Sequence, residues 1–79
     1  IESEEFTRIA SWWDRKGENE IDIIAADELE QRVTFYEVKR QAKDINIGIL
    51  KDKAVQFFNT TGSFQKFSVD YKGLSLDDI

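Results

Sequence analysis

The sequence lacks two residue types on which many enzyme and metal sites depend. It has no cysteine, so it can form neither a disulfide nor a thiolate metal site. It has no histidine, which excludes imidazole-based zinc sites, Ser-His-Asp triads and histidine general bases. Any catalysis or metal binding by this chain would therefore depend on carboxylates, amines, hydroxyls or backbone groups.

Long apolar runs and an initiating methionine are also missing. No run approaches the ~20 apolar residues that span a bilayer, and no signal-peptide pattern is present. We therefore expect a soluble, cytoplasmic chain with no membrane partner. The 79 residues suffice for one small domain. Because the first residue is Ile1, we expect residues 1–79 to be a single domain taken from a longer chain.

Charge is distributed unevenly along the chain. The formal net charge of −5 argues against simple electrostatic adhesion to nucleic acid. Residues 1–30 carry ten acids and three bases (−7), whereas residues 31–79 carry eight bases and six acids (+2). A basic segment after an acidic one suits a metal-dependent phosphate site, and it equally suits a plain solvated surface.

Hydrophobic patterning predicts several short strands. Alternating and β-branched residues predict strands over Glu20–Ala26, Arg32–Arg40 and Phe64–Lys72. Phe6–Trp13 reads as the end of a helix followed by a strand. The polar connection of residues 27–31 joins the second and third strands of the chain as an antiparallel hairpin.

After residue 46 the apolar residues no longer alternate but recur every three or four positions, which predicts one helix. Apolar residues recur there on a single helical stripe, made of Ile47, Leu50, Ala54, Phe57 and Phe58. Asp44 or Asn46 can cap its start and Gly62 its end. A capping-box pattern at Ser75–Asp78 suggests a final helix. The predicted fold class is α/β (α+β), a mixed sheet of about four strands with a flanking helix.

Two of the predicted strands carry carboxylates inside apolar runs: E-I-D-I-I-A at residues 20–25 and F-Y-E-V-K at residues 35–39. Burying such charges costs several kcal/mol (about 2–7) unless a partner compensates them. Strand alternation predicts that Glu20, Asp22 and Ile24 share one face, with Ile21 and Ile23 on the other. In the next strand, Phe35, Glu37 and Lys39 share a face, whereas Tyr36 and Val38 face away.

If the hairpin is in register, Asp22 and Glu37 lie side by side. Two like charges at that distance repel unless a cation sits between them, and Mg²⁺ or Mn²⁺ is the natural occupant of an all-oxygen site. The carbonyl of Val38 can complete the protein ligands. Lys39 can then orient or deprotonate an attacking water, with Glu20 as an auxiliary acid. The alternative is a surface hairpin with a cross-strand Lys–carboxylate pair.

The combination of these elements resembles the PD-(D/E)XK nuclease superfamily. That core carries one acid on a strand and E-x-K on the next strand, followed by a helix. Asp22 matches the single acid, and Glu37 and Lys39 match the E-x-K. The resemblance implies a restriction-endonuclease-like fold and Mg²⁺- or Mn²⁺-dependent hydrolysis of DNA.

One subgroup resembles the chain over nearly its whole length. Trp12-Trp13 before E-I-D, L-x-x-K-A at Leu50–Ala54 and G-L-S at Gly73–Ser75 are similar to the nuclease-like C-terminal domain of archaeal and bacterial AAA-type ATPases. The resemblance implies that the remainder of an ATPase chain is a partner. Such folds usually begin with a helix that bears another glutamate, for which Glu2, Glu4 and Glu5 are candidates.

Three functions remain open from the sequence. The first is a metal-dependent DNA endonuclease-like domain with Asp22 and Glu37 as metal ligands and Lys39 as the catalytic lysine. The second is a degenerate nuclease fold that serves as a protein-interaction or regulatory module. The third places the function in parts of a longer chain outside these residues. An exposed edge strand would also permit a homodimer.

Overall fold

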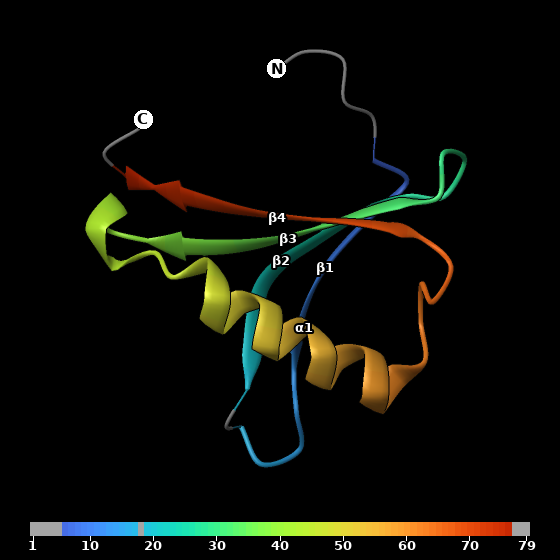
Figure 1. Cartoon of the computed structure of the whole chain (residues 1–79), viewed down its shortest axis with the longest axis horizontal. Coiled ribbons are helices and arrows are strands. Elements are labelled where there is room, and N and C mark those ends of the chain that lie inside the picture. Colours follow the sequence, from blue (N-terminus) through green and yellow to red (C-terminus); the bar gives the residue numbers. More distant parts are fainter. Residues whose placement is uncertain (1–5, 18, 77–79) are drawn as a thin grey trace.

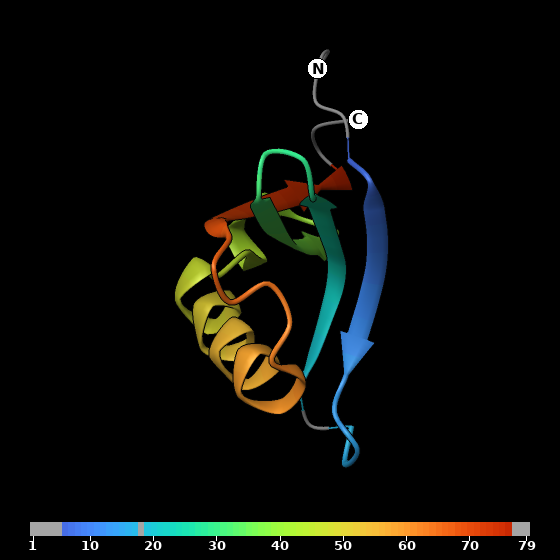
Figure 2. The same cartoon turned by 90° about the vertical axis from the view of Figure 1, so that its right-hand side faces the viewer.

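The computed structural model describes residues 6–17 and 19–76 of the chain. Their elements are β1 (Arg8–Trp13), β2 (Glu20–Asp27), β3 (Arg32–Lys39), a 3₁₀ turn η1 (Ala42–Asp44), α1 (Ile47–Thr61) and β4 (Ser68–Ser75). The strands form one sheet in the order β1-β2-β3-β4, and α1 lies across one face of it (Figures 1 and 2). The predicted α/β class, with a four-stranded sheet and a flanking helix, is confirmed for these residues.

The sheet is mixed because its last connection differs from the first two. β1 pairs with β2 and β2 with β3 in antiparallel fashion, as tight connections require. The chain then crosses the sheet through η1 and α1, and β4 runs parallel to β3. Such a crossover needs a connection of a dozen or more residues, which α1 supplies.

The start of β4 differs from the prediction. Residues 64–67 form a turn instead of the first half of a strand, since Phe64 has a φ of 56° and its carbonyl accepts a hydrogen bond from the Phe67 N–H at 3.1 Å. β4 begins only at Ser68. At the other end of the chain, β1 begins at Arg8, with no helix before it in the described residues. The predicted final helix falls on residues 77–79, outside the described residues.

Helix α1 begins and ends where the sequence predicts. The Asn46 side chain accepts a hydrogen bond from the Ile49 N–H at 3.1 Å, which satisfies one of the free donors of the first turn. Gly62 ends the helix with a φ of 67° and donates its N–H to the Phe58 carbonyl at 3.0 Å. The buried side of the helix is formed by Leu50, Ala54 and Phe57, which lie on the predicted apolar stripe.

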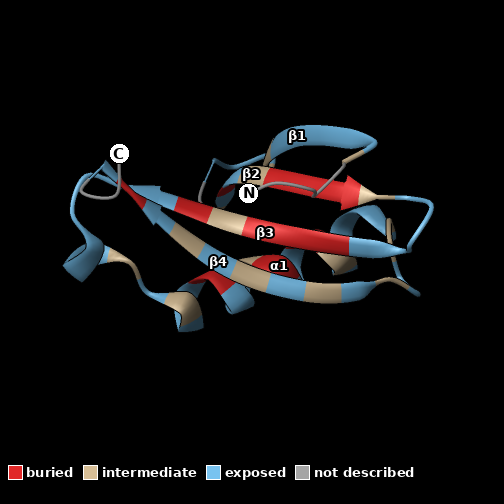
Figure 3. Ribbon diagram, turned by 90° about the horizontal axis from the view of Figure 1, so that it is seen from above, coloured by how far each residue is buried: buried red, intermediate tan, exposed pale blue. Residues whose placement is uncertain are grey.

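The core lies between α1 and the two central strands (Figure 3). Phe35 at its centre is fully buried and makes aromatic contacts with Phe57, Phe58 and Tyr71, at ring-centroid distances of 5.5–5.9 Å. Burying a side chain of this size stabilises the fold by about 1.5–3 kcal/mol. Among the described residues no helix is both long and apolar enough to cross a membrane.

Candidate functional site

A β-bulge in β2 contains Asp22, one of the predicted site residues. The pairing of β1 with β2 shifts by one residue across Asp22 and Ile23, which together lie opposite a single residue of β1. Ile21 and Ile24 on either side of the bulge both belong to the core. The predicted strict alternation, which placed Ile21 and Ile24 on opposite faces, is therefore wrong at this point. Bulges commonly re-aim side chains next to functional sites.

Asp22 lies beside the E-V-K segment of β3. The regular β2–β3 pairing runs from Asp27 and Arg32 as far as Ile23 and Tyr36. One residue further along, the Oδ2 atom of Asp22 accepts a hydrogen bond from the backbone N–H of Val38 at 2.8 Å. A side chain thus occupies the place that a backbone carbonyl would take in a regular ladder. The Asp22 side chain remains exposed to solvent.

Glu37 is the buried member of the site. Its side chain is only 5% exposed and points to the helix-covered face of the sheet, as Phe35 does. Its Oε2 atom accepts a hydrogen bond from the backbone N–H of Asn46 at 3.0 Å. Asn46 is the N-cap of α1, where the helix dipole is positive. This hydrogen bond and the dipole compensate the burial of the carboxylate.

Gly73 explains why the start of α1 comes so close to Glu37. Gly73 pairs with Glu37 in the parallel β3–β4 ladder. A Cβ at Gly73 would overlap Cγ2 of Ile45 and lie 2.8 Å from its Cδ1. Because glycine has no side chain, Ile45 packs directly on β4, and the next residue, Asn46, reaches Glu37. The contacts of Asn46 with Glu37 and of Gly73 with Ile45 were not predicted, although Asn46 was a predicted N-cap and a glycine inside a strand often marks a close approach of backbone.

The remaining predicted residues lie at the ends of β2 and β3. Lys39 ends β3, is exposed, and alternates onto the same face as Glu37. Val38 faces the other side of the sheet, and its N–H is already bonded to Asp22. Glu20 begins β2 opposite Trp13 and is exposed.

The donor set suits a hard divalent cation of the magnesium type. Asp22 accepts a hydrogen bond through Oδ2 and Glu37 through Oε2, so each acid already has one backbone partner. Within residues 6–17 and 19–76, no cluster of three or more acidic side chains is placed to hold a metal. The protein ligands predicted from the sequence are the two carboxylates and the carbonyl of Val38, with waters completing the shell. Mg²⁺ is commonly bound by one or two carboxylates plus waters and phosphate.

Comparison with known proteins identifies one matching family. A family model described as archaeal and bacterial proteins of unknown function, DUF234, matches residues 2–58. The matched span contains Asp22, Glu37, Val38 and Lys39. No curated protein sequence and no solved structure matches the chain.

Proposed function

Since the chain belongs to DUF234, a family of archaeal and bacterial proteins of unknown function, we propose a function for it from the site itself. The domain is nuclease-like and uses Mg²⁺ or Mn²⁺ to hydrolyse phosphodiester bonds in DNA. The observation that carries this proposal is the hydrogen bond between Asp22 and the Val38 N–H. It supports the proposal because it brings the acid of β2 next to the E-V-K segment of β3.

Each residue has a distinct role in the proposed reaction. Asp22 and Glu37 hold the cation, together with the carbonyl of Val38. A bound divalent cation supplies Lewis-acid stabilisation of the phosphate. Lys39 orients or deprotonates the attacking water and offsets charge that develops on the phosphate.

The buried position of Glu37 supports a rigid site. Its carboxylate accepts a hydrogen bond from the Asn46 N–H at 3.0 Å, and its side chain is only 5% exposed. A ligand that is fixed before the metal arrives loses little conformational freedom on binding. The basic residues that follow suit a phosphate substrate, because the span from Lys39 to Lys53 carries five bases and two acids.

The sequence resemblance also indicates the kind of larger protein to which the domain belongs. Trp12-Trp13, the L-x-x-K-A segment and the G-L-S segment are similar to those of the C-terminal domain of AAA-type ATPases. We therefore propose that the domain is the C-terminal part of such an ATPase.

A nuclease assay with one paired control tests the proposed activity. The wild type should cleave branched or linear DNA with Mg²⁺ or Mn²⁺ present and lose this activity with EDTA. Lys39→Met should lower the rate by about 10²-fold or more, as the loss of one transition-state donor does. Lys66→Met, at another exposed lysine outside the site, should retain the rate. Absence of cleavage with both cations and both DNA forms would overturn hydrolysis as the function.

A second function is favoured by the same hydrogen bonds. Asp22 closes the end of the β2–β3 pairing, and Glu37 fixes the start of α1. Both acids thus contribute to the fold even without a metal, as expected of a degenerate nuclease fold that acts as an interaction or regulatory module. This alternative predicts that substitution of either acid lowers stability while the wild type binds no cation in the millimolar range.

A further inference from the structure

Strand β1 is an edge of the sheet with little protection against further pairing. Among the described residues it pairs only with β2, so its outer N–H and C=O groups have no strand neighbour. The opposite edge, β4, carries the charged residues Asp70 and Lys72, a common device against edge-to-edge association. β1 carries no charge between Arg8 and Asp14.

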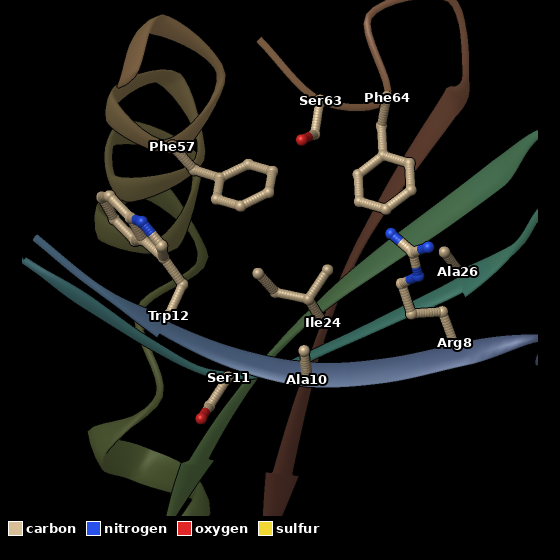
Figure 4. Close-up of a pocket in the computed structure, with 9 residues that line it drawn as sticks. All are labelled: Arg8, Ala10, Ser11, Trp12, Ile24, Ala26, Phe57, Ser63 and Phe64. Atoms are coloured by element: carbon tan, nitrogen blue, oxygen red, sulfur yellow. The ribbon is translucent and has the colours of Figure 1, made fainter. Parts of the chain in front are cut away.

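The two faces of β1 differ in what they expose. Figure 4 shows Arg8, Ala10 and Trp12 on the side of β1 where Phe57 and Phe64 lie, around a pocket of about 160 Å³, whereas Ser11 points to the other side. Ile9 and Trp13, which share the face of Ser11 by alternation, are 66% and 67% exposed. Two large apolar side chains in one edge strand therefore lie open to solvent.

We propose that a second copy of this chain pairs with β1 in antiparallel fashion about a two-fold axis at Ser11. In this register Ile9 lies opposite the partner's Trp13, and Ala10 lies opposite the partner's Trp12. Arg8 lies opposite the partner's Asp14. Because a two-fold interface is self-complementary, each of these contacts occurs twice.

Every contact in this register is favourable by size or charge. The Ile9–Trp13 contact removes two exposed apolar side chains from water, an aromatic–β-branched pair of the kind that stabilises sheets. Ala10 is small enough to leave room for the partner's Trp12 at the rim of the pocket. Arg8 and the partner's Asp14 have opposite charges. The Asp14 carboxylate already accepts a hydrogen bond from the Asn19 side chain at 2.9 Å, and a carboxylate can accept more than one.

The present partner of Arg8 does not prevent the new contact. Arg8 forms an ion pair with Glu28 at 3.6 Å, but the two side chains are 62% and 44% exposed. Exposed pairs of this kind contribute at most about 1 kcal/mol. The guanidinium can therefore reorient toward a carboxylate across the interface.

Neighbouring registers fit less well. An axis at Ala10 places Ile9 opposite the partner's Ser11 and Arg8 opposite the partner's Trp12, and it leaves Trp13 without an apolar neighbour. An axis at Trp12 places Ala10 opposite the partner's Asp14. Only the axis at Ser11 pairs both apolar residues and both charges.

Cysteine cross-linking tests the register directly because the chain has no cysteine of its own. In the proposed dimer the two Ser11 side chains face each other with Cβ atoms about 4.5–5.5 Å apart, close to the separation that a disulfide spans. Under mild oxidation Ser11→Cys should form a covalent dimer at least about tenfold faster than Ser68→Cys, at an exposed serine of the other edge strand. The wild type should have twice the 9.2 kDa mass of one chain by light scattering. A monomer at all concentrations, or equal cross-linking of the two variants, would overturn the proposal.

Charge reversal gives an independent test. Arg8→Glu and Asp14→Arg, each alone, should weaken dimerisation about tenfold because like charges then face each other in two places. The double variant should restore the wild-type dissociation constant. Circular dichroism checks that each variant is folded. A double variant that dimerises no better than the single variants would contradict the register.

Discussion

The carboxylate of Asp22 in β2 accepts a hydrogen bond from the backbone N–H of Val38 in β3 at 2.8 Å. This bond lies just beyond the last regular β2–β3 pair, Ile23 with Tyr36. The acid proposed to bind the cation therefore also holds the strand that carries the other proposed residues. For this reason, the effect of each substitution at the site on stability should be measured separately from its effect on metal binding.

Asp22→Asn and Asp22→Ala separate these two effects. Asparagine keeps an oxygen that can accept from the Val38 N–H, so stability should change by less than about 0.5 kcal/mol. Alanine removes the acceptor and should lower the free energy of unfolding by about 0.5–1.5 kcal/mol. Urea denaturation measures both. Equal stability of the wild type and Asp22→Ala would mean that this hydrogen bond contributes nothing to the fold.

Glu37 should be more sensitive because it is buried. Glu37→Ala leaves the Asn46 N–H without its carboxylate partner and opens a cavity, which should cost about 1–3 kcal/mol. Glu37→Gln keeps an acceptor oxygen and should cost less. Hydrogen exchange at the first turn of α1 should accelerate in the alanine variant more than in the glutamine variant. The reverse order would contradict the role of Glu37 as the anchor of the helix start.

Gly73→Ala should disturb the site from a distance. The new Cβ would overlap Ile45, which should cost about 1–3 kcal/mol as overpacking does. Ile45→Ala removes the overlapping atoms, so the double variant should be more stable than the sum of the two single effects predicts. Denaturation of all four proteins completes this double-mutant cycle. Additive effects would show that Ile45 is not what the alanine meets.

Local signals predicted a large part of the fold. The hairpin of β2 and β3, the N-cap at Asn46 and the helix end at Gly62 depend on neighbouring residues. Trp12 and Trp13 also follow the alternation expected of adjacent strand residues. Trp12 is partly buried and packs edge-on against Phe57, with ring centroids 5.5 Å apart, whereas Trp13 is exposed.

Two of the features that were missed, the bulge in β2 and the hydrogen bond between Asn46 and Glu37, depend on residues far apart in the chain, whereas the third is a local turn. The bulge at Asp22 and Ile23 arises from the pairing of β2 with β1, which the sequence of β2 alone does not encode. The late start of β4 follows from the positive φ of Phe64, an unusual conformation for a bulky residue. The hydrogen bond that the Asn46 N–H donates to Glu37 requires the crossover to pack against β4. None of these has a signature within a single short segment.

The most direct test is a calorimetric titration of Mn²⁺ into the wild type, Asp22→Asn and Glu37→Gln, with Asp70→Asn as the control. Asp70 is an exposed strand acid on β4, outside the site. We predict saturable binding of one ion per chain in the wild type and in Asp70→Asn, and binding at least about tenfold weaker in the two site variants. No saturable binding by the wild type in the millimolar range, or equal binding by all four proteins, would contradict a metal site at Asp22 and Glu37.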